Sequence, residues 1–324
     1  LAGARDKEAI PVLIALVGEL PYTQSAPVEE YLHRLAAGKP PASLPEGDDA
    51  AAKKRRDAWA AWWQANADHI ALVDRNPPAT AQRFLGYTML VSNQNGTVSE
   101  LGRDGKPRWT ITGLSNPMDA QLLSNDRVLI TEGGARRITE RNLKGDILWQ
   151  KQLGNSFPYN AQRLPNGNTF IACQNQLLEV DRAGKEVLTL QRPNHDVLTA
   201  RKLKGGEIVI ISNNARVSRL DATGKELKSF NLPGGGVAQT NEVLPNGNVL
   251  IAVQWMNKVM EIDPDGKVVW ETTAMQPMAP FRLPNGHTLI PLQQWPAKVI
   301  EVDKTGKQVA EMTTTTYTYR VRRR

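Results

Sequence analysis

A glycine-centred turn recurs along the chain at nearly constant intervals. The successive differences between the glycine positions are 40, 39, 40, 42 and 40 residues, and the positions are Gly105, Gly145, Gly184, Gly224, Gly266 and Gly306. The surrounding residues are alike, as Asp221-Ala-Thr-Gly-Lys225 and Asp303-Lys-Thr-Gly-Lys307 show. A fixed period of this length is typical of repeat architectures. It limits the possible folds more than any other feature of the sequence.

Each period contains four short candidate strands. In the third period these are residues 160–164, 168–173, 176–181 and 186–190. The dipeptide Asn-Gly lies between the first two strands at Asn166, and recurs at Asn246 and Asn285. Between apolar runs it predicts a hairpin with a type I′ turn, which needs positive φ at both central residues. Four antiparallel strands in about 40 residues form one blade of a β-propeller, so six turns predict an all-β, six-bladed propeller.

The two ends of the repeat region predict how the ring closes. The first period begins at its second strand, near residues 87–91, and lacks an innermost strand. The last period ends at Met312, but the chain continues through residues 317–324, which align with an innermost strand at 158–164. We expect this tail to complete the first blade and to remove an open sheet edge. Its four arginines then have a structural role.

The segment before the repeats has helical periodicity. Apolar residues of 10–20 and 28–35 recur every three or four positions, and residues 49–65 place three tryptophans, Trp59, Trp62 and Trp63, on one helix face. We expect these tryptophans to pack against neighbouring helices or the propeller. Pro77 and Pro78 mark a linker. The sequence thus predicts a small α-helical segment over 1–70, a linker over 71–85 and the propeller over 86–324.

Composition excludes several functional classes. No apolar run approaches the roughly 18 residues of a membrane span, and the net charge of +7 spread over a large surface favours solubility over nucleic-acid binding. The single Cys173 excludes an intramolecular disulfide and a cysteine-based zinc site. Asp263 and Asp265 flank a turn that lacks the rest of a calcium-binding loop. We therefore expect a monomer without a metal, a nucleic-acid partner or a membrane span.

Residues 5–14, Arg-Asp-Lys-Glu-Ala-Ile-Pro-Val-Leu-Ile, resemble the start of the second helix of a HEAT-type repeat. The resemblance covers about one repeat. Since it begins in the middle of a repeat, and the chain begins at Leu1 rather than Met, we expect that residues upstream are missing.

The repeat region resembles bacterial PQQ-like propeller proteins through elements of the form Asp-x-x-Gly-Lys-x-x-Trp, such as Asp263 to Trp270. The element Leu-Pro-Asn-Gly-Asn-x-x-Ile-Ala, at Leu164 to Ala172, is similar to repeats of arylsulfotransferase-like propellers. The resemblance implies a periplasmic or extracellular location. PQQ-type dehydrogenases generally have more blades, a calcium ion and often a vicinal cysteine pair. With six predicted blades and one cysteine, we expect no quinone and no other cofactor in this chain.

Two sets of loops at one end of a propeller usually contact ligands. The loops that enter the innermost strands contribute Asp119, Asn160, Thr199, Thr240, Ala279 and Arg320. The loops that join the second and third strands contribute Asn93, Gly133, Gln174, Asn213, Gln254 and Gln293, with Trp255 and Trp295 nearby. Amides that donate and accept, beside flat indoles, suit a sugar, a peptide or another polar ligand. Alternatively, these amides satisfy backbone groups of the loops.

Two hypotheses of function follow. In the first, the chain is a non-catalytic binding or scaffolding protein that recognises a protein, a peptide or a polar small molecule at this funnel face. In the second, it is a group-transfer enzyme. The arylsulfotransferase-like resemblance implies a histidine nucleophile with basic residues around it, and His195 alone of the four histidines precedes an innermost strand. Asp119 and Arg320 are then its candidate partners, and the hypothesis needs contact at roughly 3 Å.

Overall fold

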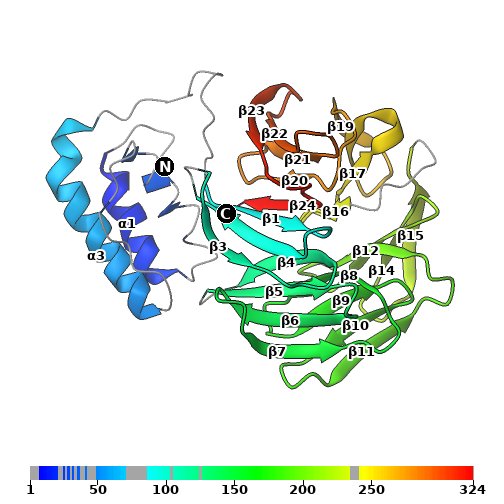
Figure 1. Cartoon of the computed structure of the whole chain (residues 1–324). Helices are drawn as coiled ribbons and strands as arrows, with labels where there is room; N and C mark the ends of the chain where they lie inside the picture. The colour runs from blue at the N-terminus through cyan, green and yellow to red at the C-terminus, as the bar shows by residue number, and fades with distance from the viewer. Residues whose placement is uncertain are drawn as a thin grey trace.

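The computed structural model describes residues 7–20, 25, 28–29, 31–32, 35–36, 41, 49–70, 86–102, 105–123, 126–233 and 241–323. Within these ranges, helices α1 (Ala9–Glu19) and α3 (Asp49–Asn66) precede six four-stranded antiparallel sheets. Figure 1 shows the sheets arranged around a centre where their innermost strands meet. The predicted six-bladed β-propeller is confirmed.

The blades follow one another along the chain, and each is described from its innermost strand outward. Blade 1 is β24 (Arg320–Arg323), β1 (Thr88–Ser92), β2 (Thr97–Leu101) and β3 (Pro107–Ile111). Blade 2 is β4 (Pro117–Leu123), β5 (Arg127–Glu132), β6 (Arg137–Asn142) and β7 (Ile147–Gln152). Blade 3 is β8 (Pro158–Arg163), β9 (Thr169–Cys173), β10 (Gln176–Val180) and β11 (Glu186–Gln191).

The remaining three blades repeat this order. Blade 4 is β12 (Val197–Lys202), β13 (Ile208–Ser212), β14 (Arg216–Leu220) and β15 (Glu226–Asn231). Blade 5 is β16 (Asn241–Val243), β17 (Val249–Val253), β18 (Lys258–Ile262) and β19 (Val268–Thr273). Blade 6 is β20 (Phe281–Arg282), β21 (Thr288–Leu292), β22 (Lys298–Val302) and β23 (Gln308–Thr313).

The hydrophobic core lies between neighbouring blades. The second strand of a blade is apolar on both faces because another blade covers each face, and all five residues of β13 and of β17 are buried. Val209 and Ile211 of β13 share one core cluster with Val249 and Ile251 of β17. In the outermost strands, exposed residues alternate with half-buried ones or predominate, as in β7 and β11. This packing accounts for the continuous apolar runs that recur once per period.

In four of the six outer hairpins, an aspartate holds the turn through its own side chain. Oδ1 of Asp221 accepts hydrogen bonds from the backbone N–H groups of Thr223 and Lys225, at 2.9 and 3.0 Å. Gly224 has φ +93°, a left-handed conformation that glycine adopts without steric penalty. The same aspartate contacts recur at Asp181, Asp263 and Asp303. Asn142 makes the same contacts in blade 2, so a side-chain oxygen at this position holds the turn in five of the six blades.

The predicted type I′ turns are wrong in one respect. Gly167 has φ +88°, but Asn166 is not among the described residues with positive φ. The Gly167 N–H donates to the carbonyl of Leu164 at 2.9 Å, and Leu164 donates to the carbonyl of Asn168 at 2.8 Å. This pattern fits a type I turn followed by a left-handed glycine, the three-residue hairpin loop. Oδ1 of Asn166 accepts from the Asn168 N–H at 3.0 Å and holds the turn without positive φ at the asparagine.

The carboxyl-terminal strand closes the ring, as the sequence predicts. β24 pairs with β1 in antiparallel register, with Arg320 opposite Val91 and Arg323 opposite Thr88. Arg323 donates to Oε2 of Glu301 in blade 6 at 2.5 Å. Equivalent ion pairs join a third strand to the next innermost strand at three other interfaces: Glu140–Arg163, Glu179–Lys202 and Glu261–Arg282. The tail thus repeats a bond that holds neighbouring blades together.

The tryptophans of α3 pack within the helical segment. Of the two contacts predicted for them, with neighbouring helices or with the propeller, the first is confirmed. Trp59 and Trp63 are buried in a cluster with Ile10 and Ile14 of α1 and with Leu32. The Trp59 and Trp62 rings meet edge to face, with centroids 5.5 Å apart. The expected second helix lies only partly within the described residues, and the linker over 71–85 lies outside them. The domain boundaries and the HEAT-like assignment stay predictions. Neither described helix combines the length and apolar character that a membrane crossing requires.

Candidate functional site

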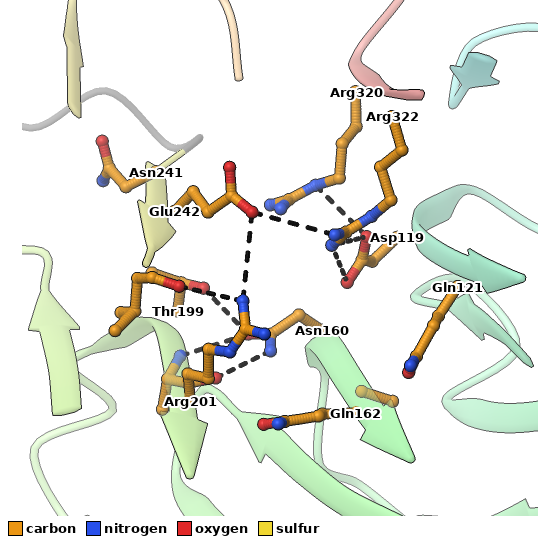
Figure 2. A pocket seen from close by; sticks show the side chains of 13 residues that line it. Asp119, Gln121, Asn160, Gln162, Thr199, Arg201, Asn241, Glu242, Arg320 and Arg322 are labelled. Carbon is orange, nitrogen blue, oxygen red and sulfur yellow. Dashed lines mark hydrogen bonds and ion pairs between the residues drawn. The ribbon is translucent and has the colours of Figure 1, made fainter. Parts of the chain in front are cut away.

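The innermost strands surround a central channel that contains a cavity of about 80 Å³ (Figure 2). Its wall has two rings of polar side chains, taken from alternate residues of each strand because successive side chains of a strand point to opposite faces. The first ring comprises Asp119, Asn160, Thr199 and Arg320. The second ring lies two residues further along the strands and comprises Gln121, Gln162, Arg201, Glu242 and Arg322.

Four residues of the first predicted set therefore lie together in the channel. The strand registers place Asp119, Asn160, Thr199 and Arg320 at equivalent positions, opposite the same point of each second strand. Ala279 forms a parallel bridge with Arg320. Thr240 lies outside the described residues. No sequence motif marks the second ring. Because every second side chain of a strand points to the same face, its positions could have been found two residues after those of the first ring.

The side-chain amides of the channel join neighbouring innermost strands. Nδ2 of Asn160 donates to the carbonyl of Ala200 at 2.8 Å, and its Oδ1 accepts from the Ala200 N–H at 3.2 Å. Gln162 makes the same two contacts with Lys202, at 3.1 and 3.2 Å. Gln121 accepts from the Arg163 N–H at 2.8 Å. These contacts with strand backbone make the blade interfaces more specific.

The charged groups of the channel form one connected network (Figure 2). Arg322 donates from Nη2 to both oxygens of Asp119, at 3.0 and 3.2 Å. Nε of Arg320 lies 3.4 Å from the same carboxylate. Oε1 of Glu242 lies 3.9 Å from Arg322 and 4.0 Å from Arg201. Three guanidinium groups thus face two carboxylates.

Burial changes the ionisation of this network. It raises the pKa of Glu242, although Arg322, Arg201 and Arg320 and the backbone N–H of Arg282 act in the opposite direction. Burial likewise lowers the pKa of Arg201, while Glu242 acts to raise it. Burial works to lower the pKa of Arg322 too, but Asp119 and Glu242 outweigh it and leave that pKa raised. The channel therefore holds charges whose energies depend on one another.

The predicted set of amides between the second and third strands is more scattered. Asn93, Gln174 and Asn213 lie in the loops after β1, β9 and β13, and Gln254 and Gln293 lie in those after β17 and β21. Nε2 of Gln254 donates to Oε1 of Gln293 at 2.9 Å. Among the described members of the set, this is the pair in direct side-chain contact. Gly133 packs against the ring of Phe157, where an added Cβ would lie 2.5 Å from that ring.

Three large apolar side chains are exposed at this end of blades 5 and 6. Trp255, Met275 and Trp295 are 65%, 60% and 72% exposed, and we call them the tryptophan patch. Backbone contacts connect their loops: Gln276 donates to Oδ1 of Asn257 at 2.8 Å, and Gln293 donates to the carbonyl of Gln276 at 2.9 Å. Exposed apolar groups gathered in this way mark interaction sites more often than isolated ones do.

His195 does not line the channel cavity. It is exposed in the loop between β11 and β12, with φ +51°, and its carbonyl accepts from Nδ2 of Asn213 at 3.4 Å. Asp119 and Arg320 do lie together in the cavity wall.

Cys173 is buried, and burial raises the pKa of its thiol to about 12. The described part of the chain contains no group of three or more metal-ligating His, Cys, Asp or Glu side chains.

Comparison with known families agrees with the propeller architecture. Residues 181–322 match the family model described as outer membrane protein assembly factor BamB. This stretch runs from the turn after β10 into the closing strand β24. The second half of the propeller is therefore similar to that family, a PQQ-like one. A search of curated protein sequences found no significant match.

Solved structures share the fold at low sequence identity. A protein of unknown function from Bacteroides caccae is 16% identical and aligns over 73% of this chain and 97% of its own, with a TM-score of 0.61. Virginiamycin B lyase from Staphylococcus aureus is 17% identical over 71% of this chain and 85% of its own, with a TM-score of 0.53. The WD40 β-propeller domain of Doa1 is 16% identical over 72% of this chain and 80% of its own, with a TM-score of 0.56. At such identities the likeness shows the fold alone.

Proposed function

We propose that this chain is a non-catalytic binding propeller that recognises a protein partner through the tryptophan patch. The exposure of Trp255 and Trp295 on adjacent blades carries the proposal. Tryptophan supplies a large rigid apolar area at little entropic cost and is enriched among the residues that dominate interface energies. Gln254 and Gln293, joined to each other beside the patch, supply donors and acceptors for its rim.

The size and chemistry of the channel support binding over catalysis. Pockets for substrates usually measure roughly 300–1,000 Å³, whereas the channel cavity measures about 80 Å³. The amide of Asn160 is engaged with the neighbouring strand. His195, the candidate nucleophile, lies in an exposed loop apart from the cavity wall. The lyase among the similar structures adds no argument for catalysis, since one fold serves many functions.

The family similarity favours a partner that is itself a protein. The matching family is described as an outer membrane protein assembly factor, and a similar propeller in this chain would act by holding another polypeptide. The same similarity supports a periplasmic or extracellular location, as part of this proposal. A propeller is suited to such a role because its end loops vary while its buried strands keep the ring intact.

The proposal is tested by exchanging the patch for small side chains. In the double variant Trp255→Ala/Trp295→Ala, the yield of proteins that co-purify from the source cells falls at least about tenfold, the loss expected from removing two interface hot spots. The matched control Val187→Ala/Leu227→Ala removes exposed apolar residues of β11 and β15 and keeps the wild-type yield. Quantitative mass spectrometry measures both.

Two results would contradict the proposal. One is equal recovery of the same proteins by the wild type and the patch variant. The other is recovery that never exceeds the background of an unrelated propeller. A thermal unfolding scan of each variant accompanies the measurement, and it is expected to match the wild type because the exchanged tryptophans are exposed.

A further inference from the structure

The ionised groups around the channel cavity do not balance. Arg201, Arg320 and Arg322 contribute +3 and Asp119 and Glu242 contribute −2, so the lining residues sum to +1. The next cations outward do not change this sum, because each has a carboxylate of its own in the interface ion pairs described above. A net charge in a poorly solvated space is unfavourable and is relieved by one counter-charge.

Arg320 differs from the arginines that join neighbouring blades. Arg163, Arg282 and Arg323 each donate to a glutamate at 2.5 to 2.6 Å. The Arg320 side chain is 8% exposed, and its one ion pair with the described residues is the 3.4 Å approach of Nε to Asp119, a carboxylate that also accepts from Arg322. Within the described chain, no group accepts a hydrogen bond of normal geometry from its Nε. Its guanidinium edge is therefore suited to two oxygens of an anion.

Glu242 presents the complementary group. Its side chain is 8% exposed, and Oε1 lies nearest the arginines. Oε2 is buried and accepts no hydrogen bond of normal geometry from the described residues. A buried carboxylate oxygen requires a donor. Figure 2 shows Glu242 and the guanidinium groups of Arg201, Arg320 and Arg322 gathered around the same space.

The size of the channel cavity limits which ligands it can hold. A buried water needs roughly 10–15 Å³ of such volume, so a cavity of about 80 Å³ accommodates a few non-hydrogen atoms. A sugar, a nucleotide or a quinone is too large. Because the charge to be balanced is a single positive one, a monovalent ion is favoured over a divalent one.

From these features we propose that the channel binds one small monovalent oxyanion that carries an O–H group. Its oxygens accept from Arg320 and Arg201, and its O–H donates to Oε2 of Glu242. Hydrogencarbonate and dihydrogen phosphate both have this chemistry. The site lies inside the ring and is separate from the tryptophan patch, so it does not depend on the proposed partner binding.

Titration of the full chain with matched anions tests the proposal. The probes are hydrogencarbonate and dihydrogen phosphate, each at a pH where the monoanion predominates, and formate, which has a similar carboxylate but no O–H. Calorimetry is expected to give one site, with either hydroxyl-bearing anion bound about tenfold more tightly than formate, as one hydrogen bond to a charged group allows. Comparison of the first two probes tells a planar from a tetrahedral ligand.

Two variants are expected to change anion binding in different ways. Arg320→Gln lowers the summed charge from +1 to 0 and weakens binding of every probe by at least about tenfold. Glu242→Met raises the charge to +2, removes the acceptor and retains binding, but hydrogencarbonate and formate then bind equally. Arg216→Gln, in an exposed pair of β14 with Glu226, keeps wild-type behaviour. If Arg320→Gln does not fold, Arg201→Gln takes its place, with the same expected loss.

Three outcomes would overturn the site: no heat of binding from any probe at millimolar concentration, equal affinity of wild type for formate and hydrogencarbonate, or unchanged affinity in a folded Arg320→Gln or Arg201→Gln variant. A rise in melting temperature with each salt is recorded in parallel. In wild type it must follow the calorimetric affinities, because a ligand that binds the native state alone raises its stability.

Discussion

At the scale of single residues, buried carboxylates are held by unusually many donors. Glu132 of β5 is fully buried and accepts from Nε and Nη2 of Arg137, from Nη2 of Arg141 and from Oγ1 of Thr139, at 2.7 to 3.2 Å. Its Oε2 also accepts from the Ser115 N–H at 3.2 Å. Burial works to raise the pKa of Glu132, but these donors together outweigh it and leave that pKa below the usual value.

The depressed pKa predicts a stability that is lost in acid. Since the pKa of Glu132 is lower in the folded chain than in the unfolded one, its contribution is complete above the unfolded value of about 4.5 and disappears as the pH falls through the folded pKa. Glu132→Gln should therefore lower the free energy of unfolding by about 3 kcal/mol at neutral pH, and by less in acid. Urea unfolding across the acidic range measures the difference, and a gap between wild type and variant that does not change with pH would refute this account.

At the scale of elements, the interface between blades is a repeated unit in its own right. A glutamate of a third strand and a cation of the next innermost strand recur in four of the six interfaces. The other two interfaces differ: Leu122 and Val243 occupy the position of the cation. β24 supplies Arg323 to the last interface, so the closing strand is bound to both of its neighbours, by backbone pairing to β1 and by an ion pair to blade 6.

The ion pair of Arg323 with Glu301 predicts that substitutions of two arginines differ greatly in their effect on stability. In Arg323→Met, Glu301 stays buried without its guanidinium, so the free energy of unfolding falls by about 3 kcal/mol. Arg216→Met removes a pair that is 43% and 42% exposed, and such pairs contribute at most about 1 kcal/mol. Chemical unfolding measures both variants. Equal losses would show that the Glu301–Arg323 pair has no special role in ring closure.

The elements were predictable from the sequence where a local rule decides them. In four of the six outer turns an aspartate and the glycine interact within a few residues. The glycine recurs in all six, so its period revealed the blades and even the role of the tail. The asparagine turns were predicted with the wrong φ because Asn166 uses its side chain, a choice that the dipeptide alone does not show. Arg201, Glu242 and Arg322 were not predicted because no motif marks them, although each lies two residues after a position of the first predicted set.

At the scale of the whole molecule, the described chain has separate cores. The cluster around Trp59 contains residues of the helical segment, while the other clusters contain propeller residues. Trp59, Trp62 and Trp63 therefore report on the core of the helical segment. Trp109, Trp149 and Trp270 belong to or pack on clusters of the propeller. Since no cluster of the described residues contains residues of both the helical segment and the propeller, these two parts are expected to unfold independently.

A chain of residues 86–324 should consequently fold by itself. Its melting temperature is expected to lie within about 2–4 °C of the propeller transition of the full chain, the shift that about 1 kcal/mol produces in a domain of this size. Far-ultraviolet circular dichroism at a strand-sensitive wavelength follows the propeller in both proteins. A much lower melting temperature, or aggregation of the shorter chain, would place the helices within the same cooperative unit.

The closure of blade 1 by β24 also bears on how the chain is made. β1 leaves the ribosome more than two hundred residues before its partner strand, since the pair joins Thr88 to Arg323. During translation the inner edge of blade 1 stays unpaired, and an unpaired edge is a template for pairing with other chains. The inner edge of blade 1 is therefore exposed while the other five blades are made, and it becomes protected only when β24 emerges.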